Sequence, residues 1–116
     1  EVGVTLTTLD NRISHITEPG APLPEKRLNA LKELTSAGVN TYALVGPVLS
    51  TLEGKEEDFV NAIISTGTGH VSLDRLNLRP NMAERLNRMG IKGSDRALEK
   101  IRRLSEDAGL EVSDVF

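Results

Sequence analysis

The sequence predicts an α/β fold built from parallel βα repeats, and three features of the chain support this prediction. Short apolar stretches alternate with longer stretches of helical pattern along the 116 residues. Residues 39–49 are almost continuously apolar, which is typical of a parallel strand covered on both faces. Residues 31–39 and 101–110 resemble each other, because in both a helical pattern ends at an Ala-Gly step before an apolar residue. Repeated βα units form a parallel sheet through right-handed crossovers, so we expect at least three parallel strands.

The first repeat opens the chain with a strand, a turn and a helix. Val2, Val4 and Leu6 alternate with small or polar residues, which is the period-two pattern of a strand. A turn rich in proline and glycine follows. Pro24 suits the first position of a helix, where its missing N–H needs no partner. The leucine spacing then predicts a helix that ends before Gly38, the usual kind of residue just past a helix C-terminus.

The later elements are marked by apolar spacing and by caps. Residues 59–64 carry the buried side of a second long helix. A third strand begins at Val71, and the shift of its apolar phase predicts a break near Asp74. A short helix is expected to end at Gly90, and Ser94 is a favourable N-cap for the last helix. The apolar residues that follow this last helix predict a fourth strand.

Length and composition limit the kind of protein. The chain is one domain or a piece of one, since an enzyme barrel typically needs about 250 residues. No stretch resembles a signal peptide or a membrane span, so we expect a cytoplasmic protein without membrane partners. The absence of cysteine excludes disulfides, a thiol nucleophile and the usual ligands of an iron–sulfur cluster. His15 and His70 lie 55 positions apart and are interpreted as surface or loop residues rather than zinc ligands.

The net charge of −3 argues against indiscriminate binding to nucleic acid. The charges are nevertheless uneven, because residues 74–103 carry nine basic and four acidic side chains, a local excess of five. This segment is interpreted as a pair of solvated amphipathic helices, with an electrostatic footprint for nucleic acid as the alternative.

The candidate site residues lie where the predicted strands end. In parallel α/β sheets and barrels, ligands bind beyond the carboxyl ends of the strands, but this rule does not distinguish an open sheet from a barrel. Hydroxyl groups at the first strand end suit a carboxylate or a ribose, and a glycine at the second lets a flat ring approach the backbone. The structural alternative is that threonine is a good strand residue and that Gly-Pro commonly ends a strand. The candidates at the three strand ends are Thr5, Thr7, Thr8 and Asp10; Val45, Gly46, Pro47 and Val48; and Asp74, Arg75, Asn77 and Arg79.

Three segments carry a resemblance to a known family. They are TLTTLD at residues 5–10, EPGAPLPEKRLNAL at residues 18–31 and AGVNTYALVGPVL at residues 37–49, with a weaker echo at residues 71–80. In this order they resemble the second half of a radical S-adenosylmethionine (SAM) domain of the spore photoproduct lyase type, also called DNA repair photolyase-like. The resemblance implies that the βα repeats form an arc, about half, of a TIM-like radical SAM barrel.

The family resemblance also implies roles for the strand ends. Ser/Thr side chains on the first strand reach the amino acid part or the ribose of SAM, and Thr5, Thr7 and Thr8 stand in those places. The next strand carries a glycine-containing adenine-binding segment, which is similar to residues 45–48, although the family spacing GxIxGxxE is not met. The following strand borders the adenine or the substrate. The resemblance therefore implies cofactor contacts at Val45, Gly46, Pro47, Leu76 and Asn77, and substrate contacts at Arg75 and Arg79.

The largest departure from the family is the absence of its CxxxCxxC loop, which binds the [4Fe–4S] cluster. We therefore expect residues 1–116 to be a single partial domain, the C-terminal half of an enzyme whose N-terminal, cluster-binding half is missing. The parent is expected to be a radical SAM enzyme, and the specific activity that the resemblance implies is that of a lyase that repairs a DNA photoproduct. This chain alone is expected to be inactive. The alternative is a free-standing α/β binding or interaction module without catalytic activity.

Partners follow from the idea of a half barrel. The N-terminal half would cover the exposed strand edges and an inner face built from Val4, Leu6, Leu44 or Val45. Without that half, we expect a second copy of the chain to cover them, which predicts a homodimer.

Overall fold

The computed structural model describes residues 1–17, 19–74 and 80–115. Its centre is a four-stranded sheet in which neighbouring strands are parallel throughout. The strands lie side by side in chain order, as β1 (Val2–Leu6), β2 (Thr41–Val45), β3 (His70–Asp74) and β4 (Glu111–Val115). The α/β class with a parallel sheet is therefore confirmed.

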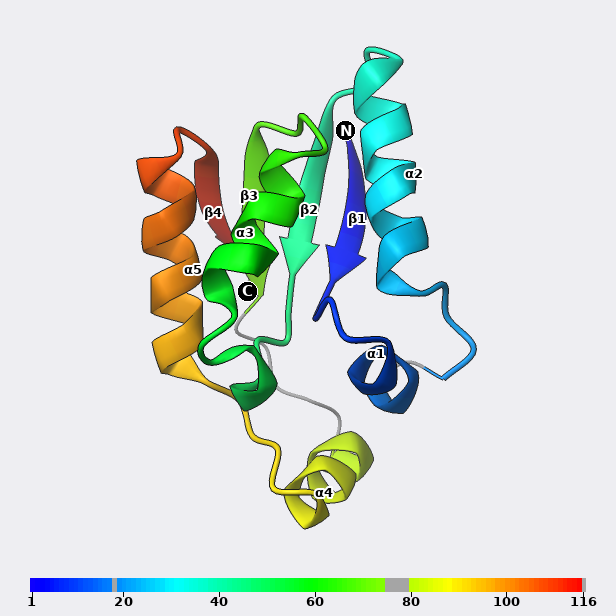
Figure 1. Cartoon of the computed structure of the whole chain (residues 1–116), viewed down its shortest axis with the longest axis vertical. Helices are drawn as coiled ribbons and strands as arrows, with labels where there is room; N and C mark the ends of the chain where they lie inside the picture. The colour runs from blue at the N-terminus through cyan, green and yellow to red at the C-terminus, as the bar shows by residue number, and fades with distance from the viewer. Residues whose placement is uncertain (18, 75–79, 116) are drawn as a thin grey trace.

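Helices form the connections between successive strands, and some of these helices lie beyond the carboxyl ends of the strands (Figure 1). They are α1 (Asn11–Thr17), α2 (Pro24–Ser36), the 3-10 helix η1 (Ser50–Leu52), α3 (Glu56–Ile64), α4 (Pro80–Arg88) and α5 (Asp95–Asp107). The predicted helix start at Pro24 and the N-cap at Ser94 are confirmed, since the Ser94 hydroxyl accepts a hydrogen bond from the Ala97 N–H at 3.1 Å. Gly38 has a φ of 85° and follows α2, as predicted. Helix α1 is an element that the sequence reasoning did not anticipate.

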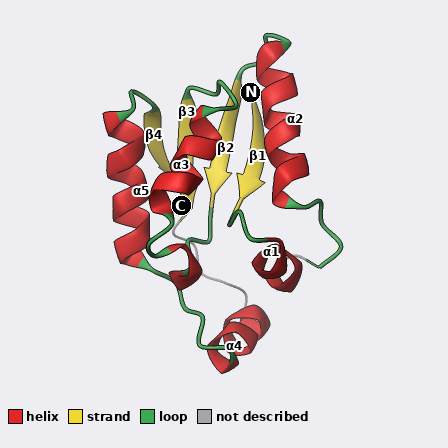
Figure 2. Cartoon of the chain, in the orientation of Figure 1, coloured by secondary structure: helices red, strands yellow, loops and turns green. Residues whose placement is uncertain are grey.

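The helices that pack on the sheet all lie on one of its faces, called the helix face below (Figures 1 and 2). The register aligns Leu6 with Val45 and Val45 with Leu73, so these three side chains form a row on that face. All three are at most 1% exposed. The main core unites this row with side chains from α2, α3 and α5, among them Leu31, Phe59, Val60, Ile63, Leu98 and Ile101.

The opposite face of the sheet, called the open face below, carries mostly polar side chains together with Tyr42, Leu44 and Val115. Its central row runs through Thr5, Leu44, Ser72 and Ser113, which the register places beside one another. The expectation that Val4, Leu6 or Val45 would form an uncovered inner face is wrong, because these residues belong to the helix-face core or pack against it. Successive side chains of a strand point to opposite faces, so burying Leu6 and Val45 under the helices leaves Leu44 as the one residue of the predicted inner face that lies on the open face.

A second, smaller core lies beyond the carboxyl ends of the strands. Leu49, Leu86 and Ile91 are buried together, and Ile13 and Ile16 of α1 pack against them. Two backbone hydrogen bonds tie the β2–α3 connection to the α4–α5 connection, from the Ser50 N–H to Lys92 at 2.7 Å and from the Ser94 N–H to Val48 at 2.9 Å. The connections that follow β1, β2 and β3 therefore form one packed layer at the carboxyl edge.

Strand β4 is held to the last helix by an ion pair. Arg102 of α5 donates a hydrogen bond to the Asp114 carboxylate, and this bond raises the pKa of Arg102 above its usual value against the opposing effect of burial. Because the pKa of this cation is raised in the folded chain, the contribution of the pair to stability is complete at every pH at which an arginine of the unfolded chain is protonated. Arg102 therefore keeps its charge at any ordinary pH, and its deprotonation does not break the ion pair.

Candidate functional site

The carboxyl edge of the sheet brings together the ends of β1, β2 and β3, as the sequence predicted for the candidate residues. Thr5 lies within β1 with its side chain on the open face, in the row of Ser72 and Ser113. Thr7 and Thr8 follow the end of β1, and both are about 95% buried. Gly46 follows β2 directly, and its N–H donates to the Leu6 carbonyl oxygen at 3.3 Å. These positions are thus close in space.

Thr8 and Asp10 have a clear local role. The Thr8 hydroxyl accepts a hydrogen bond from the Asp10 N–H at 3.0 Å. One carboxylate oxygen of Asp10 accepts from the N–H groups of Arg12 at 2.8 Å and Ile13 at 3.4 Å. These contacts satisfy donors at the start of α1, as an N-cap does. The two residues turn the chain from β1 into α1.

Gly46 is explained by its neighbour on β3. A Cβ atom at Gly46 would lie 2.5 Å from the Asp74 Cβ and 2.7 Å from the Asp74 carbonyl oxygen. The space that a side chain would need is therefore filled by Asp74, and glycine permits this close approach of the two strand ends. The Gly46–Pro47 peptide bond is cis. The Val45 side chain is fully buried in the helix-face core, so a ligand at the open face could meet only its backbone.

The remaining predicted contacts lie outside the described residues. They are Leu76 and Asn77, predicted for the cofactor, and Arg75 and Arg79, predicted for the substrate. The basic segment continues into α4, where Arg85 and Arg88 are exposed and Arg88 pairs with Glu84 at 2.9 Å. His15 is exposed on α1, as predicted.

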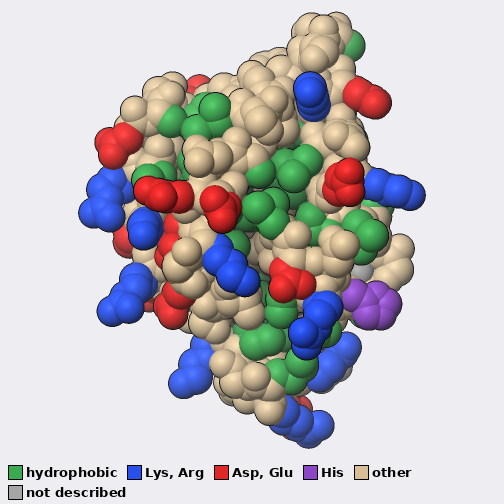
Figure 3. All heavy atoms as spheres, viewed as in Figure 1, with side chains coloured by type: hydrophobic (Ala, Val, Ile, Leu, Met, Phe, Trp, Pro, Cys, Tyr) green, Lys and Arg blue, Asp and Glu red, His purple; other side chains and the backbone are tan. Residues whose placement is uncertain are grey.

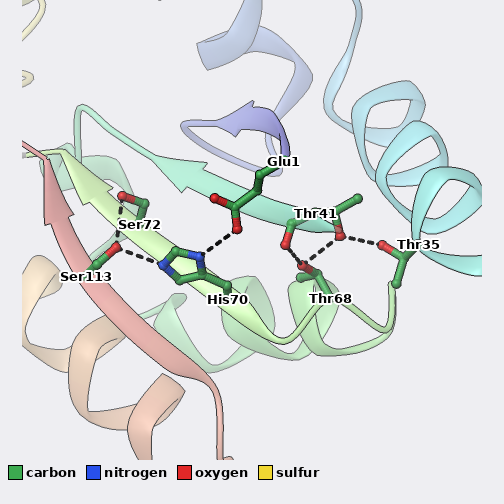
Figure 4. A network of polar contacts seen from close by, with 7 residues as sticks. All are labelled: Glu1, Thr35, Thr41, Thr68, His70, Ser72 and Ser113. Carbon is green, nitrogen blue, oxygen red and sulfur yellow. Dashed lines mark hydrogen bonds and ion pairs between the residues drawn. The ribbon is translucent and has the colours of Figure 1, made fainter. Parts of the chain in front are cut away.

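His70 occupies a more organised position than the sequence suggested. Figure 4 shows its ring between Glu1 and Ser113. Nδ1 lies 3.5 Å from a Glu1 carboxylate oxygen, and Nε2 lies 2.8 Å from the Ser113 hydroxyl, which donates to Ser72 at 3.3 Å. The ring centroid of Tyr42 is 5.7 Å away. This polar group spans the open face from β1 to β4. Its one sequence signal is that His70 directly precedes the strand predicted to begin at Val71.

Gly3 explains how Tyr42 fits on that face. A Cβ atom at Gly3 would come within 2.2 Å of the Tyr42 ring, so the ring lies across the bare backbone of β1. The open face thus combines one aromatic ring with imidazole, carboxylate and hydroxyl groups. Such a surface suits contact with a polar molecule better than burial against an apolar layer.

Two kinds of site find no support among the described residues. No group of three or more His, Asp or Glu side chains there is arranged to hold a metal ion. No helix in the described ranges has the length and apolar character needed to cross a membrane.

Comparison with known proteins yields little. No family model matches the chain, and no solved structure matches it significantly. A protein of Methanocaldococcus jannaschii, named only as uncharacterized, is 36% identical over 52 residues. The match covers 45% of this chain and 20% of that protein. The chain therefore matches about one fifth of the length of a longer protein.

Proposed function

We propose that this chain is the C-terminal half of a radical SAM enzyme and contributes strand ends that face SAM and the substrate. The sheet topology carries the proposal. Four parallel strands in simple chain order, with all packed helices on one face, support an arc of a barrel over a doubly wound sheet, which carries helices on both faces. In such an arc the open face lines the barrel interior. Its polar side chains suit an interior that binds a polar cofactor.

The fit to SAM differs between the two predicted contact regions. At β1, Thr5 presents a hydroxyl on the open face, and Thr7 follows nearer the strand end, so these groups fit the amino acid part or the ribose. At β2 the fit is poorer, because Asp74 occupies the space beside Gly46 through which a flat ring was expected to approach. Residues 45–47 stay in the proposal only through their backbone groups. A [4Fe–4S] cluster, which supplies the electron for SAM cleavage, would have to be held by the missing half, because this chain has no cysteine.

SAM binding tests the placement. The isolated chain should bind SAM weakly or undetectably in calorimetry, because it lacks the cluster that holds the amino acid part. A longer parent that includes the N-terminal half should bind SAM, and Thr5→Val and Thr7→Val should weaken this binding. Micromolar affinity in the isolated chain that survives both substitutions would show that the site is placed wrongly.

The gene upstream of Glu1 separates this proposal from its alternative. A CxxxCxxC motif roughly 100 residues earlier fits the first half of a barrel of about 250 residues. A start codon adjacent to Glu1 would favour a free-standing α/β binding or interaction module. One observation favours that module: the helix-face core, with Phe59, Ile63 and Ile101 fully buried, is complete without a second half.

The substrate part of the proposal is a damaged nucleobase in DNA, on which the parent would act as a lyase. Its support is the basic excess of residues 74–103. DNA affinity of the isolated chain should be weak and strongly salt-dependent. Tight binding at physiological salt that is unchanged by substituting Arg75, Arg79, Arg85 and Arg88 would remove nucleic acid from the proposal.

A further inference from the structure

A hollow of about 290 Å³ opens beyond the carboxyl ends of β1 and β2. It lies between the connection that follows β1 and the segment that runs from η1 into α3. Leu52 belongs to the helix-face core and Leu9 packs against it, so the floor of the hollow is apolar and lies on the helix side of the sheet. Figure 3 shows this side of the molecule, where hydrophobic surface is interrupted by acidic and basic side chains. The lining residues are Thr8, Leu9, Asp10, Thr51, Leu52, Lys55 and Asp58.

The charged groups of the hollow are available to a ligand. Lys55 and Asp58 are exposed, and within the described ranges neither makes an ion pair or a side-chain hydrogen bond. Asp10 uses one carboxylate oxygen for the start of α1 and leaves the other without a hydrogen bond to the described chain. The Thr8 hydroxyl accepts from the Asp10 N–H and retains its own proton for donation.

We propose that this hollow binds a small zwitterion of the α-amino acid class. The ligand carboxylate would pair with the Lys55 ammonium group, and the ligand ammonium group with the carboxylates of Asp58 and Asp10. Its side chain would rest on Leu9 and Leu52. The volume corresponds to about ten water molecules at roughly 30 Å³ each, which leaves room for a medium-sized amino acid.

The charges of the lining decide against other small ligands. One ammonium and two carboxylate groups give a net charge of −1, so a phosphate dianion meets more repulsion than attraction. A neutral sugar forms hydrogen bonds with the carboxylates but offers no charge to Lys55. A zwitterion satisfies both signs at once, and charge-assisted hydrogen bonds are the stronger kind.

This inference can be tested separately from the proposed SAM site, although Thr8 lines the hollow and is also predicted to contact SAM. That site uses Thr5 on the open face and Thr7 beyond the end of β1, whereas the floor of the hollow lies on the helix side and neither threonine lines it. Lys55→Met should therefore leave SAM binding by the longer parent unchanged, and Thr5→Val should leave amino acid binding by this chain unchanged. Failure of one proposal can thus be recognised without failure of the other.

Titration of the isotope-labelled 116-residue chain with L-leucine, followed by NMR, tests the inference. Amide signals of residues 8–10 and 51–58 should shift in a saturable way. L-Leucinamide lacks the carboxylate and N-acetyl-L-leucine lacks the ammonium group, and each should bind at least tenfold more weakly. Lys55→Met and Asp58→Asn should each weaken leucine binding at least tenfold. Lys32→Met, an exposed lysine of α2, is the matched control and should change nothing.

Three results would overturn the inference. The first is no saturable shift at millimolar leucine in a chain whose spectrum is well dispersed. The second is equal binding of leucine and its two analogues, which would mean that only the apolar floor is recognised. The third is a shift of the same signals by inorganic phosphate or D-ribose but not by leucine, which would assign the hollow to another class of ligand.

Discussion

Arg27 of α2 donates a hydrogen bond from Nη1 to the Thr5 carbonyl oxygen of β1 at 2.9 Å. In β1, the Val2 N–H and the Leu6 carbonyl oxygen bond toward β2, so the carbonyl of Thr5 points to the outer edge of the sheet. Nε of Arg27 also donates to the Pro22 carbonyl oxygen at 3.0 Å, which fixes the guanidinium group. A charged side chain thus covers part of an edge that is otherwise open to pairing with another chain.

The first prediction is that Arg27→Met increases self-association. The substitution keeps an apolar stem but frees the Thr5 carbonyl at the strand edge, where a second copy can pair. Light scattering over a concentration series should show the proposed homodimer at lower concentration than for the original chain. Lys26→Met removes a neighbouring exposed charge that makes no side-chain hydrogen bond or ion pair in the described ranges, and it should have no such effect. Both proteins remaining strictly monomeric would contradict association through the sheet edges.

The second prediction concerns the start of α5. The Ser94 hydroxyl accepts from the Ala97 N–H at 3.1 Å and donates to a Glu53 carboxylate oxygen at 2.6 Å. Ser94→Ala removes the cap and the link to the β2–α3 connection, so it should lower the free energy of unfolding by about 1–2 kcal/mol. Urea denaturation measures this loss. Ser65→Ala is a useful control, because that hydroxyl is exposed and bonds only within its own helix end.

Local chemistry explains which elements could be predicted from the sequence. Pro24, Gly38 and Ser94 each mark a helix end through a property of the residue itself: a missing N–H, a permitted positive φ and a hydroxyl acceptor. The parallel βα order follows from the repeat and from the handedness of crossovers. These signals need no knowledge of distant contacts.

The features that could not be predicted depend on distant contacts. Helix α1 has only seven residues, and its apolar side chains Ile13 and Ile16 gain their burial from a small core around Leu49 and Leu86. A pattern this short does not specify a helix by itself. The assignment of Val4 and Leu6 to an uncovered face failed for a similar reason: alternation separates two faces, but only the placement of α2, α3 and α5 decides which one is covered. The contact of His70 with Ser113 joins residues 43 positions apart and requires the β3–β4 register.

The third prediction compares two threonines under the same substitution. Thr41 is 4% exposed, and its hydroxyl lies 2.7 Å from that of Thr35 and donates to that of Thr68 at 3.0 Å (Figure 4). The Thr51 hydroxyl oxygen is buried and has no hydrogen-bond partner among the residues that the structure describes. Thr41→Val should therefore cost about 1–3 kcal/mol, whereas Thr51→Val should be neutral or stabilise by up to about 1 kcal/mol.

Thermal and urea unfolding of the two variants test this comparison. The substitutions are chemically identical, so the difference between them isolates the hydrogen bonds from the loss of a hydroxyl group as such. Equal destabilisation by both would mean that Thr51 has a polar partner in solution. A neutral Thr41→Val would remove the threonine network from the interactions that hold the amino-terminal ends of β2 and β3.

The last prediction concerns the contact between the ends of β2 and β3. Gly46→Ala would place a Cβ 2.5 Å from the Asp74 Cβ and 2.7 Å from its carbonyl oxygen, so the two strand ends must separate. Overpacking of this kind typically costs about 1–3 kcal/mol. Gly69→Ala is the matched control, because a Cβ there meets no atom within 4 Å and the φ of Gly69 is not positive, so the variant should be neutral or slightly stabilised. If Gly46→Ala keeps full stability but abolishes SAM binding in the proposed longer parent, the glycine serves the proposed cofactor rather than the contact with Asp74. If Gly46→Ala instead lowers the free energy of unfolding, the close packing of β2 against β3 is what requires glycine at this position.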